Sequence, residues 1–455
     1  MQKSFYDRFS NFVFLISCLL VIYMPLHVFI VQSASLVTGG LSVWKAAKDV
    51  IVFALVPLLL YISYKKKIYH GKYFWHLIVG GSFVGLHLLF LVFSTKDDNY
   101  SAIVGTIYNS RLLVYFLLGV VVGSYKLGEK YLKYLLTATV LIASAVALFG
   151  VLQYFLPHDI LSHVGYSLER GVKPMFFIDD KPDLPRVMST LKDPNSLGAY
   201  LILPILLSGY ALIKSEVNKK LFIRTFRRGT LAAMSGVMLL ALFLTFSRGA
   251  LLALMLSTVT ILSIATGERV WRFIKKQLFY VVAAIFLFSF IIFQFRNTYV
   301  FQNLVFHADQ STVLADPNEL RVSLTQDAVN KIVDTPLGHG PGTAGLVSIK
   351  NPKGGLLTEN YYLQIAYEVG WVGITLFIVV LCLIGRQLYI LSRKNPASAV
   401  LFSSLVGYLF YSLLIHLWSN EAIALQWWLL AGLCLGYHMR NSSILVGIIN
   451  QKVKV

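Results

Sequence analysis

The stretch ENYYLQIAYEVGWVGITLFIVVLCLI, residues 359–384, decides the fold class of this chain. From residue 361 onward it is predominantly apolar and long enough for an α-helix that crosses the hydrocarbon core of a membrane. The same hydropathy pattern recurs along the whole chain. It predicts twelve spans, near residues 11–31, 44–64, 73–93, 104–124, 131–156, 195–213, 229–246, 249–266, 278–295, 361–384, 398–417 and 421–439.

The composition agrees with this pattern. Of the 455 residues, 57% are hydrophobic and 13% are charged, a balance that a soluble domain of this length does not need. The sequence therefore predicts an all-α polytopic membrane protein with about twelve transmembrane helices. We expect a single integral membrane domain over residues 1–455.

The formal charge of +19 would suggest a nucleic-acid partner in a soluble protein. Here the positive residues gather in every second connection, as the positive-inside rule requires of cytoplasmic segments. We therefore expect a protein of the cytoplasmic membrane with both termini in the cytoplasm, and no nucleic-acid partner. Two long segments then lie outside the membrane, a first outer loop at 157–194 and a large outer loop at 296–360.

The large outer loop, between the ninth and tenth spans, contains its own predicted helix. Asp316-Pro317-Asn318-Glu319 supplies an N-cap acid, a proline at the first helical position and a glutamate at N3. An apolar stripe follows at every fourth residue, and Pro336 ends the helix. The stripe consists of Leu320, Leu324, Ala328 and Ile332.

Two arginines lie near the outer ends of spans. Arg248 occupies the tight turn between the seventh and eighth spans, where the N-terminus of the next helix favours an anion. The alternative is an arginine that anchors the turn at the lipid headgroups. Arg111 lies inside the fourth span, and a charge there indicates either a functional site or an internal ion pair, for instance with Asp49.

Further polar candidates come from the two outer loops. Arg186 precedes the sixth span and is a candidate for anion contact. Asp193 or Asn195 beside Pro194 is a candidate helix N-cap. Arg321, in the first turns of the loop helix, is either an anion ligand or a solvated surface charge.

The glycine-rich run Gly338-His339-Gly340-Pro341-Gly342 permits a sharp turn and a close backbone approach to a ligand. It lacks the Gly-Lys-Ser/Thr ending of a nucleotide-binding loop, and no βαβ unit surrounds it. His339 is a ligand, a base or a turn residue. We predict no metal site, because no second histidine or acid stands at ligand spacing.

Glu359, just before the start of the tenth span, is the best candidate for a general base. A partly desolvated carboxylate has a raised pKa, which suits proton transfer near neutral pH. The alternative role is that of an acid placed favourably at a helix N-terminus.

These residues together resemble a known family. Glu359-Asn360, nine residues and then Gly370-Trp371-Val372-Gly373 resemble a signature of the O-antigen ligase and O-antigen polymerase (Wzy-type) family. The resemblance covers roughly residues 186–375. It extends to Pro194-Asn195, to Ser247-Arg248-Gly249, and to Arg321 followed by Pro336-Leu337-Gly338-His339-Gly340.

The resemblance implies an inverting, metal-independent glycosyltransferase without a cofactor that acts on glycans linked to undecaprenyl diphosphate. Glu359 would then be the base. The diphosphate would be bound by four arginines, Arg248, Arg321, Arg111 and Arg186. The substrate would be contacted by Gly338, His339, Gly340, Asn360, Tyr361 and Asn195. A partner that regulates chain length is a further candidate.

The ligases of this family generally carry histidine where this chain has Glu359, which favours a polymerase of O-antigen, capsule or exopolysaccharide repeat units. The alternative enzyme is a ligase that transfers polymer to the lipid A core. From other classes, a flippase for lipid-linked oligosaccharide and a membrane scaffold also remain open.

Overall fold

The computed structural model describes residues 2–66, 74–93, 99–178, 181–266, 317–348 and 355–452. Nearly all regular structure in these ranges is helical. The elements in chain order are α1 (Gln2–Tyr23), η1 (Met24–Leu26), α2 (His27–Thr38), α3 (Leu41–Ala54), α4 (Val56–Lys65), α5 (Phe74–Phe93), α6 (Asn99–Gly123), α7 (Gly128–Gln153), η2 (Ser162–Val164), β1 (Phe176–Ile178), β2 (Lys181–Arg186), α8 (Pro194–Ile213), α9 (Ser215–Leu221), α10 (Arg228–Leu244), α11 (Arg248–Thr266), α14 (Pro317–Asp334), α15 (Gly345–Ser348), α16 (Tyr361–Ser392), α17 (Pro396–Tyr411), η4 (Leu417–Ser419) and α18 (Glu421–Lys452).

The prediction of an all-α polytopic membrane protein is confirmed. In the described part of the chain, nine helical stretches are long and apolar enough to cross a membrane, and α10 and α17 are shorter apolar helices. These stretches coincide with eleven of the twelve expected spans. The remaining expected span, 278–295, lies outside the described residues.

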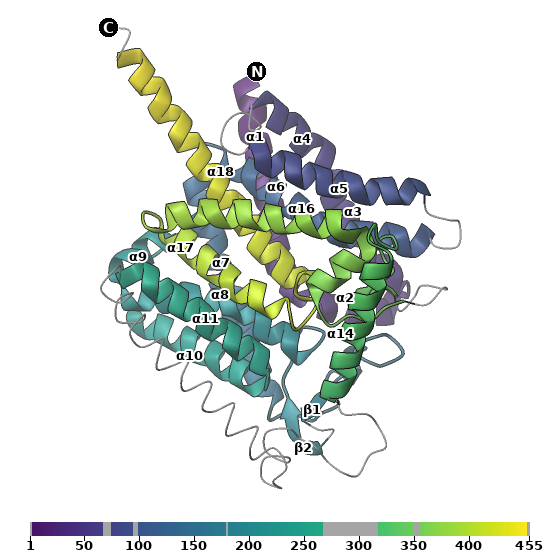
Figure 1. Cartoon of the computed structure of the whole chain (residues 1–455). Helices are drawn as coiled ribbons and strands as arrows, with labels where there is room; N and C mark the ends of the chain where they lie inside the picture. The colour runs from purple at the N-terminus through teal and green to yellow at the C-terminus, as the bar shows by residue number, and fades with distance from the viewer. Residues whose placement is uncertain are drawn as a thin grey trace, which may run out of the picture.

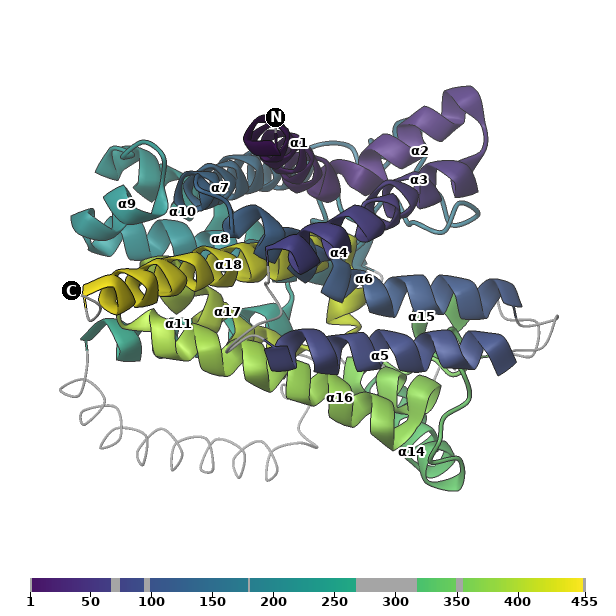
Figure 2. The same cartoon turned by 90° about the horizontal axis from the view of Figure 1, so that it is seen from above.

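The helices form a bundle with two distinct ends. Figure 2 shows α14 and α15 at one end of the bundle, and α9 and the C-terminal end of α18 at the opposite end. Figure 1 shows β1 and β2 far from both termini. These strands pair antiparallel, with Phe176 opposite Arg186 and Phe177 opposite Pro185.

The centre of the bundle is the contact between α6 and α18. Glycines on both helices face the partner's backbone, and a Cβ at any of them would collide with a backbone carbonyl of the other helix. Small residues spaced by four allow this close approach between membrane helices. The contact lies between the C-terminal half of α6 and the middle of α18. The four glycines are Gly119, Gly123, Gly432 and Gly436.

The helix expected in the large outer loop is present as α14, and it ends at Asp334 as predicted. Its apolar stripe packs inward, since Ala328 and Ile332 are buried and α14 lies against α16. The stripe therefore attaches the loop helix to the bundle beside α16.

Candidate active site

The helix α16 begins with a side-chain cap and contains a break. The side chain of Asn360 accepts hydrogen bonds from the backbone N–H groups of Tyr362 at 2.9 Å and Leu363 at 3.2 Å, so Asn360 is the N-cap. The helix is interrupted at Val369 and Gly370, and Gly370 has a φ of 66°. The nine-residue spacing of the sequence signature thus separates an N-cap from a helix break.

The glycine-rich segment lies directly on this break. The N–H groups of His339 and Gly340 donate to the carbonyl oxygens of Tyr367 and Glu368, at 2.9 and 2.8 Å. The N–H of Trp371 donates to the carbonyl of Pro336, shortly before the segment, at 3.0 Å. These bonds satisfy backbone groups that a broken helix leaves without an intrahelical partner.

Two residues of the run have further contacts. The ring of His339 stacks on that of Tyr367, with centroids 4.0 Å apart. A Cβ at Gly338 would lie 2.6 Å from the carbonyl oxygen of Glu368, so only glycine fits there. Gly338, His339 and Gly340 therefore have a visible structural role, and their predicted contact with substrate stays a prediction.

The side chain of Glu368 holds the same segment from within the bundle. It is fully buried and accepts hydrogen bonds from Asn109 Nδ2 at 2.7 Å, from Gly342 N at 3.0 Å and from Ala344 N at 3.4 Å. A buried carboxylate with three donors is well satisfied. Glu368 thus connects α6, α16 and the outer loop.

The candidate base Glu359 is half-buried immediately before the N-cap. Tyr361, the next residue after the cap, is fully buried, and its hydroxyl donates to Asn109 Oδ1 at 3.4 Å. Its backbone N–H donates to the carbonyl of Ser412, just past the end of α17, at 2.9 Å. The start of α16 is therefore fixed against both α6 and α17.

Three of the predicted site residues converge on the same end of α17. Arg186 donates from Nε to the carbonyl of Thr245 at 2.9 Å and from Nη2 to Asn195 Oδ1 at 3.2 Å. The hydroxyl of Tyr411 bonds to Ser247 Oγ at 2.7 Å and to the carbonyl of Asn195 at 3.4 Å. Arg248, beside Ser247, is exposed at the start of α11.

Tyr411 is adjacent in sequence to Ser412, whose carbonyl oxygen accepts a hydrogen bond from the N–H of Tyr361. The structure therefore brings Arg186, Asn195 and the turn that carries Arg248 close to the Glu359-Asn360-Tyr361 segment. The helix N-cap beside Pro194 is Asp193, whose side chain accepts a hydrogen bond from Ser196 N at 2.8 Å. The side chain of Asn195 does not cap the helix and instead accepts the hydrogen bond from Arg186. For Arg321, in the first turns of α14, the side chain lies outside the described part.

Arg111 lies apart from this group, in a buried ion cluster. Its guanidinium is fully buried and lies 3.4 Å from Glu421 Oε1 and 3.9 Å from Asp49 Oδ1. It also donates to the carbonyl of Ser419 at 2.6 Å. Lys48, also buried, pairs with Asp49 at 3.0 Å and with Glu421 at 3.6 Å. The ion pair with Asp49 considered from the sequence is thus present, with Glu421 as the nearer partner.

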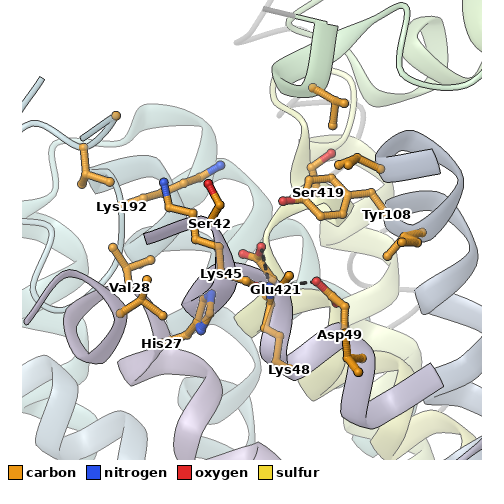
Figure 3. Close-up of a pocket in the computed structure, with 18 of the residues that line it drawn as sticks. His27, Val28, Ser42, Lys45, Lys48, Asp49, Tyr108, Lys192, Ser419 and Glu421 are labelled. Atoms are coloured by element: carbon orange, nitrogen blue, oxygen red, sulfur yellow. Dashed lines mark hydrogen bonds and ion pairs between the residues drawn. The ribbon is translucent and has the colours of Figure 1, made fainter. Parts of the chain in front are cut away.

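The ion cluster forms one wall of a cavity of about 540 Å³, the lysine cavity. Figure 3 shows Lys48 and Asp49 facing Glu421, with Lys45 and Lys192 together at one side. Its lining comes from α2, α3, α6, the first outer loop and the starts of α16 and α18. The charged and polar members are His27, Gln32, Ser42, Lys45, Lys48, Asp49, Lys192, Gln364, Ser419 and Glu421.

Sequence reasoning did not single out Lys45 and Lys48 as site residues. Their signal was present, because two lysines and Asp49 within one short part of a predicted span are costly in a membrane unless they face a partner or a cavity. The partners come from α6 and α18, which only the folded structure identifies.

A histidine, His416, contacts a cavity-lining residue near the start of α16. His416 Nδ1 is 2.8 Å from Oε1 of Gln364, a cavity-lining residue. His416 follows the end of α17. Burial, assisted by the positive charge of Lys192, lowers the pKa of His416 to about 4. The imidazole is therefore neutral near neutral pH.

Comparison with known proteins shows which proteins this chain is similar to. Residues 233–378 match a family model described as O-antigen ligase. That range includes the Arg248 turn, α14, the glycine-rich segment and α16 as far as its break. A curated O-antigen polymerase from Salmonella muenchen is 22% identical over 338 residues, which cover 73% of this chain and 78% of the relative. In both respects the chain is similar to the O-antigen ligase and polymerase family.

This similarity to the O-antigen ligase and polymerase family broadly supports an O-antigen polymerase or ligase activity in a multi-pass membrane protein. The resemblance seen in the sequence is thereby confirmed. The signature has a physical basis in this structure, because Asn360 caps α16 and Gly370 breaks it.

Proposed function

We propose that this chain polymerises glycan repeat units carried on undecaprenyl diphosphate at the outer face of the cytoplasmic membrane. The observation that carries the proposal is the convergence of Arg186, Asn195 and the Arg248 turn with the Glu359-Asn360-Tyr361 segment around the end of α17. This places cationic groups and a carboxylate at one end of the bundle, as transfer from a diphosphate donor requires.

In this reaction Glu359 removes the proton from a hydroxyl of the acceptor sugar, and that oxygen attacks the anomeric carbon of the donor. The bond from the anomeric carbon to the diphosphate oxygen breaks with inversion, and undecaprenyl diphosphate leaves. Arg248 and Arg186, with Arg321, stabilise the leaving diphosphate through charge-assisted hydrogen bonds.

The outer-face location rests on charge topology. The basic connections mark the cytoplasmic side, and α9 and the C-terminal end of α18 lie at one end of the bundle, opposite α14 and α15. No nucleotide sugar reaches the outer face, so a lipid-linked donor supplies the activated sugar. The diphosphate is the leaving group, and the arginines neutralise its charge without a metal ion.

A polymerase is favoured over a ligase by Glu359, where the family's ligases generally carry histidine, and by the name of the Salmonella relative. The ligase differs only in its acceptor, the lipid A core. A flippase would move the same lipid-linked glycan without forming a bond.

The test is reconstitution of the purified full-length protein in liposomes with a lipid-linked repeat unit. Chain growth, resolved on a gel and insensitive to EDTA, is the expected result for a polymerase. Transfer only to an added lipid A core acceptor would identify a ligase, and movement without new bonds a flippase. The variant Glu359→Gln should lower chain growth by about 10²- to 10⁴-fold, the usual contribution of a general base, while the protein stays folded. Wild-type chain growth by this variant would overturn the assignment of Glu359.

A further inference from the structure

The turn that carries Arg248 adopts a backbone conformation that its own residues do not favour. Phe246, two residues before Arg248, has a φ of 49°, in the left-handed region that residues with a Cβ rarely adopt. Such a conformation persists where surrounding contacts fix it, and it is frequent at functional sites. The bond from Ser247 N to Thr245 Oγ1, at 3.2 Å, lies within the turn. Further contacts come from distant parts of the chain.

Tyr411, the last residue of α17, contacts both neighbours of Arg248. Its buried hydroxyl donates to the carbonyl of Asn195 at 3.4 Å and bonds to Ser247 Oγ at 2.7 Å. A phenol can donate one hydrogen bond and accept another, so both contacts form together. On the other side of the arginine, a Cβ at Gly249 would lie 2.6 Å from the Tyr411 ring, so only glycine fits there.

These contacts close into a ring. Arg186 donates from Nε to the carbonyl of Thr245 and from Nη2 to Asn195 Oδ1. Asn195 in turn accepts the Tyr411 hydroxyl, and Tyr411 bonds to Ser247, two residues after Thr245. Each member is therefore held from two sides. The ring fixes the position of the turn relative to Arg186.

We propose that Tyr411 is a positioning residue that aligns Arg248 with Arg186 for binding of the donor diphosphate. The backbone of the turn sets the direction in which the exposed Arg248 side chain leaves the bundle, and the Tyr411 hydroxyl holds that backbone. Tyr411 thus acts through Arg248. This inference rests on the proposed function, which assigns the two arginines to the donor.

The test begins with Tyr411→Phe, which keeps the ring and removes the hydroxyl. Chain growth by the full-length protein in liposomes is measured over a range of lipid-linked donor concentrations. The KM for the donor should rise about fivefold, the effect of one lost hydrogen bond. We expect kcat to stay within about twofold, because the carbonyl of Ser412 still accepts the N–H of Tyr361 beside the candidate base.

Tyr408→Phe is the matched control. Tyr408 is also fully buried on α17, and its hydroxyl donates to the carbonyl of Ala199, on the same helix α8 as Asn195, at 3.2 Å. The variant loses a similar bond but no contact with the Arg248 turn. Its KM should equal that of the wild type. An equal rise of KM in Tyr408→Phe and Tyr411→Phe would overturn the proposal, since general loosening of α17 would then explain both.

A double variant shows whether Tyr411 acts through Arg248. Once Arg248→Gln has removed the guanidinium, adding Tyr411→Phe should raise the KM no further. A further rise of about fivefold, as for two independent sites, would overturn the proposal. Ser247→Ala removes the other partner of the hydrogen bond, and it replaces Tyr411→Phe if that variant unfolds at a lower temperature than Tyr408→Phe.

Hydrogen exchange at the Ser247 amide reports on the turn without turnover. Exchange should be faster in Tyr411→Phe and unchanged in Tyr408→Phe. Polymer synthesis by Tyr411→Phe with the wild-type KM would overturn the positioning role and keep the proposed function. A wild-type protein that makes no polymer would remove the proposed function and with it the role in donor binding, whereas faster exchange would still establish that Tyr411 fixes the turn.

Discussion

The side-chain amide of Asn109 donates a hydrogen bond of 2.7 Å to the carboxylate of Glu368, which joins the middle of α6 to the N-terminal part of α16. The same carboxylate accepts the N–H groups of Gly342 and Ala344. One buried acid thus fixes the outer-loop segment to two helices of the membrane bundle.

Glu368→Ala should lower the free energy of unfolding by about 3 kcal/mol, because three buried donors lose their acceptor and each loss costs about 1–3 kcal/mol before relaxation. Glu368→Gln keeps one acceptor oxygen and should lose less. Thermal unfolding in detergent measures both. Glu216→Ala is the control, since that side chain is 77% exposed on α9 and its loss should cost under about 0.5 kcal/mol. Equal stability of Glu368→Ala and Glu216→Ala would contradict the role of Glu368.

Gly370→Ala should release the glycine-rich segment from the break in α16. The φ of 66° strains a residue with a Cβ by about 1–2 kcal/mol, and the new Cβ would collide with the carbonyl of Pro336. Hydrogen exchange at the amides of His339 and Gly340 should become faster. Gly236→Ala, in the middle of α10 with open space around its Cβ, should leave that exchange unchanged. Unchanged protection in Gly370→Ala would show that the segment is held without the break.

Arg186 and Arg248 should respond differently to substitution. Arg186→Lys loses the fixed geometry that reaches both Thr245 and Asn195, so the free energy of unfolding should fall by about 1–2 kcal/mol. Arg248→Gln changes an exposed side chain and should leave stability within about 0.5 kcal/mol. It should instead raise the KM for the lipid-linked donor about tenfold, the effect of one lost charge-assisted bond. Chain-growth kinetics and thermal unfolding separate the two effects, and a destabilised Arg248→Gln with normal KM would argue against the anion role.

His416 should make stability depend on pH in a defined window. Its pKa is about 4 in the folded protein against 6.5 for an ordinary histidine, so between these values the unfolded chain binds a proton that the folded chain does not. The contribution is fully present above pH 6.5 and is lost as the pH falls toward 4. His416→Gln removes it, so the stability difference between wild type and variant should shift in favour of the variant on going from pH 7.5 to pH 4.5. A difference independent of pH would contradict the lowered pKa.

Local signals in the sequence predicted several elements well. The end of α14 at Asp334 followed from the proline at position 336, which disfavours helical geometry at the residue before it. The expected N-cap Asp316 lies outside the described residues. The membrane spans were also predictable, because each is a long apolar run within one stretch of sequence. Asp193 was one of two candidate caps, and the structure selects it.

Features that depend on contacts between distant segments were not predictable. The break at Gly370 is hidden in an apolar run, because a glycine there also fits an unbroken membrane helix, and only docking of residues 336–342 reveals it. The lysine cavity likewise requires α3, α6 and α18 to meet. The convergence of Arg186, Asn195 and Arg248 depends on Tyr411, which has no local signal of its own.

The spacing between Asn360 and Gly370 fixes the distance along α16 between the N-cap and the helix break. The eight helical residues from Tyr361 to Glu368 rise by about 12 Å, at about 1.5 Å each, and so set the distance from the cap to the break on which residues 336–342 dock. A single inserted residue would turn the cap about 100° around the helix axis relative to that docking point. The segment therefore tolerates changes of side chain more readily than changes of length, and an insertion between residues 361 and 369 would point Glu359 toward a different neighbour.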